Sequence, residues 1–224
     1  MHEVYEVTRV LVADDHDLVR MGIVRMLGDV SDIEVVGEAC CGEEAVKLAK
    51  ELQPDIILMD VRMPGIGGLE ATRKVIAACK TTKVIAVTSV SDDIFPERLM
   101  KAGASGYVTK GAGFDEIIDA INTVKRGSLY MSTSIAQQLA LRNFSGGGTD
   151  GGSPFDSLSE RELQTSIMIA NGSKAQEIAD AFCVSSKTVN TYRYRIFDKL
   201  NIGSDVELAL LAVKYKLLDI DTSS

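Results

Sequence analysis

Short apolar runs alternate with helical patterns along the first 126 residues. The run Val7–Ala13 is rich in β-branched side chains, which favour strands. Similar runs recur, each followed by an amphipathic stretch. The predicted strands are Val7–Ala13, Ile33–Ala39, Asp55–Met59, Lys83–Val87 and Gly106–Val108, and the predicted helices are Leu18–Leu27, Glu43–Leu52, Leu69–Cys79, Phe95–Ala102 and Phe114–Arg126. Strands joined by helices of this length form right-handed βαβ units, so the pattern predicts an α/β domain with a doubly wound, five-stranded parallel sheet.

The last third of the chain shows helical periodicity and no strand pattern. Its predicted helices are Leu158–Ala170, Lys174–Phe182, Ser186–Leu200 and Ser204–Lys216. Ser159, Ser185 and Ser204 stand where N-caps are expected, and Ser159 with Glu162 three residues later fits a capping box. This part of the chain is therefore expected to form a small all-α domain.

The two patterns are separated by a segment that cannot bury apolar surface. Residues 145–153 are dominated by glycine and predict a flexible linker, and residues 133–142 before them predict a connecting helix. We therefore expect a first domain at 1–128, a linker helix and Gly-rich linker at 129–154, and a second domain at 155–224.

Composition and charge narrow the possible classes of protein. The 224 residues include 24 basic and 32 acidic side chains, a net charge of −8, which argues against a histone-like binder. No apolar run approaches the roughly 18 residues that span a bilayer, and the N-terminus lacks the pattern of a secretory signal. The four cysteines include the adjacent Cys40 and Cys41 but no zinc-ligand spacing, so buried or half-buried thiols in a reducing cytoplasm are expected, with no membrane partner.

Polar residues follow four of the five predicted strands directly. Asp14 and Asp15 follow the first strand, Asp60 the third, Thr88 the fourth and Lys110 the fifth. Because parallel strands end at one edge of the sheet, these side chains are expected to lie together at the usual ligand-binding edge. Converging carboxylates call for a cation, and oxygen ligands suit Mg²⁺. A lysine and a hydroxyl beside them favour a phosphoryl group.

Each of these residues alone has an ordinary explanation as a turn or strand-end residue, and two enzymatic alternatives fit poorly. The segment Gly65–Glu70 places Glu70 where a dinucleotide fingerprint requires glycine or alanine. A phosphatase of the haloacid dehalogenase type also uses an aspartyl nucleophile, but it requires a second aspartate where Arg62 stands.

From about Val7 to Arg126 the chain resembles the response-regulator receiver domain, which has a flavodoxin-like fold. The matching segments are Val12–His16, Leu58–Gly65, Val87–Ser89 and Gly106–Lys110. The resemblance implies that Asp60 accepts a phosphoryl group from the phosphohistidine of a sensor histidine kinase. It also implies direct Mg²⁺ ligation by Asp15 and Asp60.

The same resemblance gives roles to the residues around the acceptor. Asp14 would hold Mg²⁺ mostly through water, and the main-chain carbonyl of Arg62 would complete the protein ligands. Lys110 and Thr88 would bind phosphoryl oxygens, and Thr88 and Tyr107 would form the switch, with the aromatic ring moving inward as Thr88 moves.

In the second domain, the predicted helices Lys174–Phe182 and Ser186–Leu200 are joined by a short turn. That is the geometry that places a helix in the DNA major groove. Residues 185–200 are locally basic although the domain is not, as phosphate binding requires. Their charged residues are Lys187, Arg193, Arg195 and Lys199 against Asp198.

The segments Leu158–Leu163, Ala175–Ala179 and Ser186–Tyr192 resemble the LuxR-type helix-turn-helix of NarL/FixJ regulators, and Thr188–Phe197 resembles the GacA/UvrY subgroup. The resemblance implies two sets of contacts to DNA. Candidate base contacts are Asn190, Thr191 and Tyr194, and candidate phosphate contacts are Lys187, Thr188, Arg193 and Arg195.

The sequence thus predicts a non-enzymatic, cytoplasmic transcription regulator of a two-component system, switched by phosphorylation of Asp60. Its expected partners are a sensor histidine kinase, promoter DNA and a second copy of itself when phosphorylated or on DNA. Two alternatives stay open: a metal-dependent phosphatase or phosphotransferase with a separate substrate, and an adaptor whose helical module binds protein.

Overall fold

The computed structural model describes residues 7–88, 95–111, 113–137, 153–215 and 217–218. The described residues up to 137 belong to one compact unit, and those from 153 onward belong to a second. Residues 138–152, which hold most of the Gly-rich segment and half of the expected connecting helix, lie outside the described residues. Residues 133–137 are helical, as expected for the start of that helix.

The first unit is a parallel α/β sheet domain, as the hydrophobic pattern predicts. Its strands run in the order β2-β1-β3-β4-β5-β6, and every neighbouring pair is parallel. The elements are β1 (Thr8–Ala13), α1 (Asp17–Gly28), β2 (Ile33–Ala39), α2 (Gly42–Leu52), β3 (Ile56–Asp60), α3 (Gly67–Ala78), β4 (Lys83–Thr88), α4 (Phe95–Lys101), β5 (Gly106–Thr109), α5 (Phe114–Lys125) and β6 (Tyr130–Met131). The strand order reverses between β1 and β3, which makes the carboxyl ends of these two strands the expected binding point.

The sheet has one strand more than the five that the sequence predicts. Strand β6 has only two residues, too few to produce a recognisable alternation of apolar and polar positions. Its Tyr130 N–H donates to Ser105 O at 3.0 Å, and Ser132 N–H donates to Tyr107 O at 3.0 Å. These bonds cover the outer edge of β5, which would otherwise be exposed along its length.

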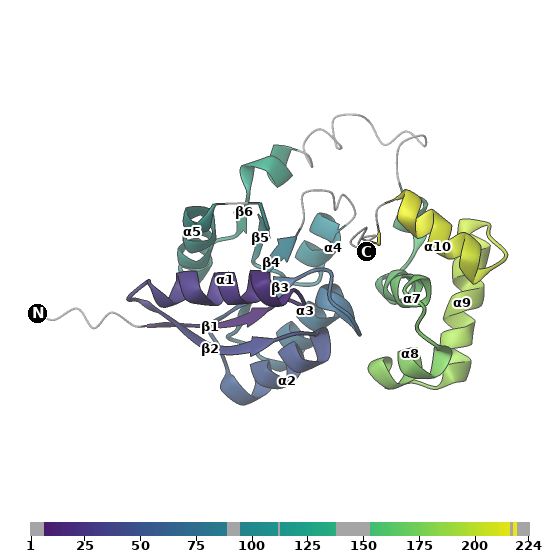
Figure 1. Cartoon of the computed structure of the whole chain (residues 1–224), viewed down its shortest axis with the longest axis horizontal. Helices are drawn as coiled ribbons and strands as arrows, with labels where there is room; N and C mark the ends of the chain where they lie inside the picture. The colour runs from purple at the N-terminus through teal and green to yellow at the C-terminus, as the bar shows by residue number, and fades with distance from the viewer. Residues whose placement is uncertain (1–6, 89–94, 112, 138–152, 216, 219–224) are drawn as a thin grey trace, which may run out of the picture. The chain divides into compact units, whose positions relative to one another are not determined.

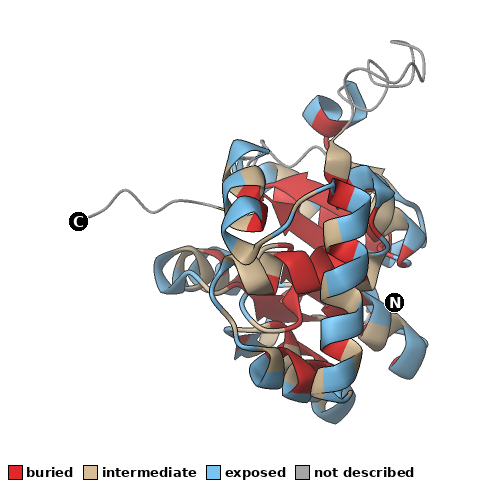
Figure 2. Ribbon diagram, turned by 90° about the vertical axis from the view of Figure 1, so that its right-hand side faces the viewer, coloured by how far each residue is buried: buried red, intermediate tan, exposed pale blue. Residues whose placement is uncertain are grey.

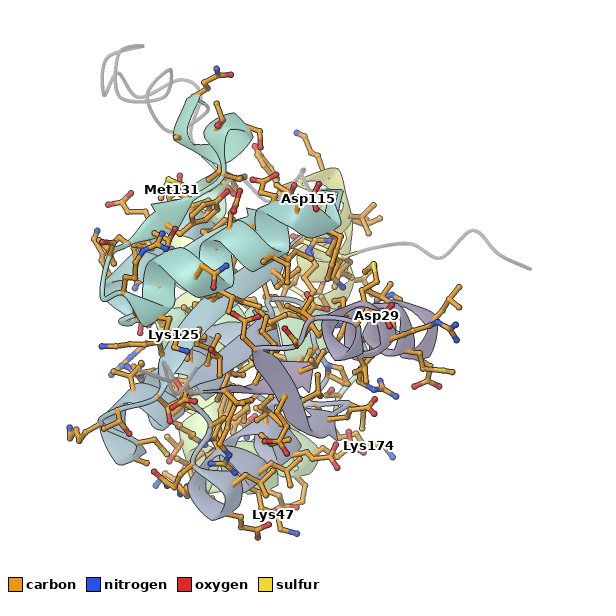
Figure 3. All side chains as sticks on the ribbon, turned by 90° about the vertical axis from the view of Figure 1, so that its left-hand side faces the viewer. Asp29, Lys47, Asp115, Lys125, Met131 and Lys174 are labelled. Carbon is orange, nitrogen blue, oxygen red and sulfur yellow. The ribbon has the colours of Figure 1, made fainter. Side chains whose placement is uncertain are left out.

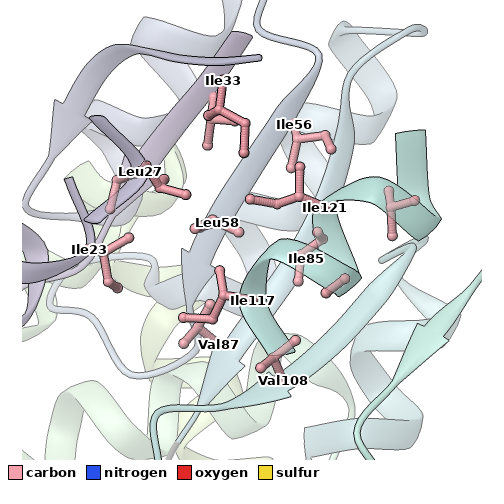
Figure 4. Close-up of a cluster of buried hydrophobic side chains, with 14 residues drawn as sticks. Ile23, Leu27, Ile33, Ile56, Leu58, Ile85, Val87, Val108, Ile117 and Ile121 are labelled. Carbon is pink, nitrogen blue, oxygen red and sulfur yellow. The ribbon is translucent and has the colours of Figure 1, made fainter. Parts of the chain in front are cut away.

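Helices cover both faces of the sheet, with α1 and α5 on one face and α2, α3 and α4 on the other (Figure 1). Alternate strand positions face the α1/α5 layer, where Ile56 and Leu58 pack beside Ile117 and Ile121 of α5 (Figure 4). Strands β1, β3, β4 and β5 are buried almost throughout, whereas the edge strands β2 and β6 are partly exposed. The helices expose their outer faces (Figure 2). Each fully buried aliphatic side chain contributes about 1.5–3 kcal/mol to folding.

The outer helices carry charges that suit the helix dipole. Asp115 and Lys125 stand at opposite ends of α5 (Figure 3), with the acid in the first turn and the base in the last. No helix among the described residues is long and apolar enough to span a membrane.

The second unit contains only helical elements within its described residues. They are the 3₁₀ turn η1 (Pro154–Ser157), α7 (Glu160–Ala170), α8 (Ala175–Phe182), α9 (Ser186–Leu200) and α10 (Asp205–Lys214). The N-caps predicted at Ser159, Ser185 and Ser204 are all present, each accepting the main-chain N–H of the residue three positions later. Ser159 with Glu162 forms the predicted capping box.

Candidate functional sites

The register of the parallel strands brings the sequence-predicted acidic residues together. Ala13 pairs with Met59, so Asp14 and Asp60 come next to each other at the ends of β1 and β3. Thr88 pairs with Thr109, so Lys110 leaves the sheet beside Thr88. The four residues therefore meet at the carboxyl edge, at the point where strand order reverses.

A lysine links the two buried carboxylates at this acidic edge. Lys110 Nζ lies 2.7 Å from Asp60 Oδ2 and 2.9 Å from Asp14 Oδ2. Asp14 and Asp60 are only 1% and 2% exposed, so neither charge is solvated by bulk water. The second oxygen of Asp60 accepts the main-chain N–H of Arg62 at 3.1 Å. One cation thus partly balances two buried anions.

Asp15 and His16 complete the acidic edge on its solvent side. Asp15 Oδ1 lies 2.9 Å from His16 Nδ1, and His16 N–H donates to Asp14 Oδ1 at 2.9 Å. Four residues each contribute one ligand atom to a cluster at this edge, and these four atoms all lie within 4.8 Å of one another. The residues are Asp14, Asp15, His16 and Asp60. His16 lies within a segment that resembles the receiver motifs, but nothing in its sequence position assigns it a role.

Burial controls the protonation of the acceptor candidate. Desolvation raises the pKa of Asp60 to about 7, and the Asp14 charge adds to the rise, while Lys110 and the Arg62 N–H oppose it. Burial lowers the pKa of Lys110, but its attraction to Asp60 and Asp14 outweighs that effect and leaves its pKa above the usual value. Lys110 therefore stays charged, and Asp60 needs further positive charge nearby to be fully ionised at neutral pH.

The acidic edge has the chemistry of a hard-cation site. Its donors are carboxylate oxygens with one exposed imidazole at the rim, and oxygen-rich sites suit Mg²⁺. The buried oxygens Asp14 Oδ2 and Asp15 Oδ1 each face one nitrogen at 2.9 Å, Lys110 Nζ and His16 Nδ1 respectively. Because three carboxylates converge beside Lys110, a bound cation would offset the repulsion that remains between them.

The loop after β3 is held in place by contacts that the sequence pattern did not reveal. Glu43, in the first turn of α2, accepts the Ile66 N–H at 3.0 Å. Gly68 lies so close to β3 that a Cβ there would sit 1.9 Å from the carbonyl oxygen of Asp60. Only glycine allows this approach, and an acidic residue 17 positions before Asp60 gave no recognisable signal.

The two residues expected to form the switch are both buried. Thr88 is 1% exposed at the end of β4, and Tyr107 is fully buried in β5. The Tyr107 ring therefore already lies inside the domain, which is the position that the resemblance implies for the switched state. The residues directly after Thr88 lie outside the described part of the chain.

Most of the candidate DNA contacts share one exposed face of α9. Lys187, Asn190, Thr191, Tyr194 and Arg195 are exposed, and Tyr194 is 74% exposed. Their spacing of three and four residues places them along one side of the helix. The buried face of the same helix consists of Val189, Ile196 and Leu200. A large polar and aromatic face without a packing role is typical of a recognition helix.

Three other residues of α9 have partners within the domain. Arg193 Nη2 lies 2.6 Å from Asp205 Oδ2 of α10, and Lys199 Nζ lies 2.6 Å from Glu162 Oε2 of α7. Thr188 Oγ1 lies 2.9 Å from Ser185 Oγ at the N-cap. The basic stripe expected from the sequence is therefore reduced, since Lys199 and Arg193 pair with carboxylates of neighbouring helices. Lys187 and Arg195 are its exposed cations that form no such pair among the described residues.

Two of the four cysteines are more exposed than the sequence predicts. Cys79 is buried and Cys41 is half-buried, as expected, but Cys40 and Cys183 are exposed. Both lie in short connections, the first before α2 and the second after α8, where a helical pattern no longer indicates which side faces the core.

Two family models match the chain, one in each unit. The response regulator receiver domain matches residues 10–122, and the luxR family of bacterial regulatory proteins matches residues 156–212. Together they cover both candidate sites and leave out the Gly-rich segment.

Curated relatives match over nearly the whole length. Response regulator GacA of Pseudomonas aeruginosa is 61% identical over 211 residues, covering 94% of this chain and 98% of the relative. Response regulator UvrY of Escherichia coli K12 is 50% identical over 215 residues, covering 96% and 98%. A LuxR-family response regulator from Aurantimonas sp. SI85-9A1, solved by crystallography, has a TM-score of 0.59 and 36% identity over 62% of this chain and 99% of that chain.

Proposed function

This chain belongs to the response regulators that join a receiver domain to a LuxR-type DNA-binding domain, and we propose that Asp60 is its phosphoryl acceptor. The family makes it a DNA-binding transcription regulator of a two-component system. The observation that carries the acceptor assignment is the Lys110 ammonium, which lies within 2.9 Å of both Asp60 and Asp14 at the buried edge.

In the proposed reaction, a carboxylate oxygen of Asp60 attacks the phosphorus of a kinase phosphohistidine. The new P–O bond forms as the P–N bond breaks, and the bond's electron pair returns to the imidazole nitrogen, which takes up a proton. Lys110 then holds a phosphoryl oxygen in place of the Asp60 oxygen that it contacts before transfer. The Thr88 hydroxyl binds a second oxygen, and Thr88 and Tyr107 pass the change to the surface of the domain.

A divalent cation fits this reaction. Asp15, Asp60 and the main-chain carbonyl of Arg62 would hold Mg²⁺ directly, and Asp14 would hold it through water. The ion would supply positive charge against the phosphoryl oxygens. The convergence of ligand atoms from Asp14, Asp15 and Asp60, all within 4.8 Å of one another, supports this assignment.

The acceptor is tested by locating the phosphoryl group. We expect the full chain to form one acyl phosphate with acetyl phosphate and Mg²⁺. Borohydride reduction followed by peptide mass spectrometry should convert residue 60, and no other, to homoserine. Conversion at Asp14, Asp15 or another carboxylate would contradict the assignment.

We propose that the kinase approaches over the first turns of α1. Leu18 and Met21 are 84% and 63% exposed, and they follow Asp14 and Asp15 closely in the chain. Large apolar side chains exposed beside a reactive group are typical of a docking surface. Leu18→Ser should slow transfer from a phosphorylated kinase but leave phosphorylation by acetyl phosphate unchanged. Equal slowing with both donors would contradict this docking surface.

The proposed DNA interface is the exposed face of α9. Asn190, Thr191 and Tyr194 would contact bases, and Lys187, Thr188 and Arg195 would contact phosphates. Arg193 would reach a phosphate by exchanging the Asp205 carboxylate for it. Sequencing of genomic fragments retained by the chain, with and without acetyl phosphate, would give the promoter sequence; retention without any sequence preference would contradict promoter recognition.

We also propose a homodimer when the chain is phosphorylated or on DNA. Val206 and Leu210 are 70% and 66% exposed on one side of α10, four residues apart. A second copy would cover them. Leu210→Glu should abolish cooperative DNA binding, whereas unchanged cooperativity would contradict this dimer face.

The same proposal includes the domain boundaries, the absence of a separate substrate and the cellular location. We place the receiver at 1–128, the linker at 129–154 and the DNA-binding domain at 155–224. Because the phosphoryl acceptor is the chain itself, we propose that the protein turns over no separate substrate. A regulator that binds promoter DNA would work in the cytoplasm.

A further inference from the structure

A second cluster of ligand atoms lies outside the acidic edge, at the connection between β2 and α2. One ligand atom each from Cys40, Cys41 and Glu44 lies within a group whose members are all within 4.8 Å of one another. Two sulfurs and one carboxylate oxygen make this group chemically different from the oxygen-rich acidic edge. The reactions proposed above use none of the three residues.

The convergence of the two sulfurs comes from the backbone at the start of α2. Adjacent residues in an extended chain point to opposite sides. Cys41 is the N-cap of α2, with φ −153° and ψ 167°, and the helix begins at Gly42. The chain turns here, so that both thiols face Glu44 in the first helical turn. The Cys40 N–H donates to Glu44 Oε2 at 2.8 Å, which fixes the carboxylate beside the thiols.

The chemistry of the three ligand atoms fits a cation. The Cys40 main-chain N–H holds one carboxylate oxygen of Glu44 in place at 2.8 Å, so this ligand is already positioned beside the sulfurs. A metal ion would displace the protons of the two thiols, as it does at other thiol sites.

The geometry and accessibility also fit. Two ligands about 2.3 Å from a tetrahedral Zn²⁺ lie about 3.8 Å from each other. The three ligand atoms, which are all within 4.8 Å of one another, would therefore need to close by about 1 Å at most. Cys40 is exposed, and Cys41 and Glu44 are half-buried, which leaves a path for the ion and room for a water as a fourth ligand. Thiolates select thiophilic cations over Mg²⁺.

We propose that Cys40, Cys41 and Glu44 form a binding site for a thiophilic divalent cation, with Zn²⁺ as the representative ion. Binding releases the two thiol protons to solvent and forms two metal–sulfur bonds and one metal–oxygen bond. The site stands next to the acidic edge, because Ala39, directly before Cys40, accepts the Asp14 N–H at 3.0 Å. The protein would thus hold a soft-cation site beside its proposed Mg²⁺ site.

The test uses Co²⁺ as a spectroscopic substitute for Zn²⁺ on the full chain. A reducing agent without thiols keeps the cysteines reduced, and excess Mg²⁺ occupies the acidic edge. We expect one Co²⁺ per chain with sulfur-to-cobalt charge-transfer absorption, and displacement of this ion by Zn²⁺. Absence of the charge-transfer absorption would overturn the proposal.

Matched variants separate this cluster from the other thiols. Cys40→Ser and Cys41→Ser should each weaken Zn²⁺ binding more than about tenfold, and Glu44→Gln should also weaken it. Cys183→Ser removes another exposed thiol and should leave the absorption and the affinity unchanged. Retained absorption in the Cys40→Ser/Cys41→Ser double variant, loss in Cys183→Ser, or unchanged affinity in Glu44→Gln would each overturn it. Phosphorylation by acetyl phosphate verifies that each variant is folded.

Discussion

The acidic edge and the exposed face of α9 are both polar, but they are built in opposite ways. The acidic edge draws residues from four strands far apart in sequence and buries them in mutual contact, as Asp14, Asp60 and Lys110 show. The α9 face takes consecutive turns of one helix and leaves them in solvent. Buried, coupled groups act as a unit, so losing one disables the site. Exposed groups contribute to binding additively, so losing one removes only the contribution of that group.

The largest expected effect is the loss of the acceptor. Asp60→Asn keeps the shape of the side chain but removes the nucleophile, and we expect no acyl phosphate with radiolabelled acetyl phosphate and Mg²⁺. Asp115→Asn, which changes an exposed acid on α5, should label like the parent. Full labelling of Asp60→Asn would show that the acidic edge does not act as a unit around this residue.

The next largest effect is expected from removal of the Lys110 ammonium, which contacts both Asp14 and Asp60. Lys110→Ala should slow phosphorylation by acetyl phosphate by about 10²–10³-fold, because a positioned charge on the transferred group is lost. Lys101→Ala serves as a control, since this exposed lysine pairs with Glu97 on α4. The measurement is the initial rate of label incorporation. If both variants react alike, Lys110 does not contact the phosphoryl group.

The acidic edge should also leave a signature in the pH dependence of stability. The pKa of Asp60 rises from its ordinary 3.8 to about 7 on folding. The folded state therefore holds the proton more tightly, and the stability from protonated Asp60, full at low pH, is lost as pH rises from about 4 to about 7.

In Asp60→Asn, the side chain at position 60 is uncharged at every pH, so the variant avoids this loss of stability. In chelator-containing buffer, its free energy of unfolding should exceed that of the parent by on the order of a few kcal/mol above pH 7. The gain should shrink as pH falls towards 4. Chemical denaturation at several pH values measures it, with Asp115→Asn as the control. A pH-independent difference would show that burial does not raise the pKa of Asp60.

The exposed face of α9 should give smaller, graded effects. Asn190→Ala should relax preference at particular base pairs and weaken specific binding by roughly 1–3 kcal/mol. Arg195→Ala should weaken binding to all sequences and flatten the salt dependence by about one unit. Affinity titrations at several salt concentrations distinguish them. Equal loss of specific and nonspecific affinity in Asn190→Ala would contradict base reading.

Arg193→Ala should change the salt dependence least. The Arg193 guanidinium already pairs with the Asp205 carboxylate at 2.6 Å. A DNA phosphate would therefore replace that carboxylate rather than add a new ion pair. If Arg193→Ala reduced the salt dependence of DNA affinity as much as Arg195→Ala does, the ion pair with Asp205 would not limit the contact of Arg193 with phosphate.

The two sites also differ in how much the sequence could predict. The acidic edge follows from strand ends alone, since parallel strands carry Asp14, Asp60, Thr88 and Lys110 to one edge. Contacts that cross between elements were not visible. Nothing near Glu43 indicates that it holds Ile66, and nothing near Arg193 indicates that it meets Asp205. Such pairs depend on the packing of whole elements, which local periodicity does not encode.

Short and irregular segments were the other source of error. Strand β6 has two residues and no alternation to recognise, and it is defined by its partner β5. The thiols of Cys40 and Cys41 are adjacent in sequence, and only the turn into α2 brings both to Glu44. The spacing rules for zinc ligands do not describe a site of this kind.

The central claim is that phosphorylation of Asp60 governs the DNA binding of α9. The most direct measurement is the affinity of the full chain for a promoter fragment, with and without acetyl phosphate and Mg²⁺, for the parent and for Asp60→Asn. The account predicts that the phosphodonor raises the parent's affinity by roughly 5- to 150-fold and leaves Asp60→Asn unchanged. An equal response in both proteins, or no response in a parent that carries the phosphoryl group, would contradict it.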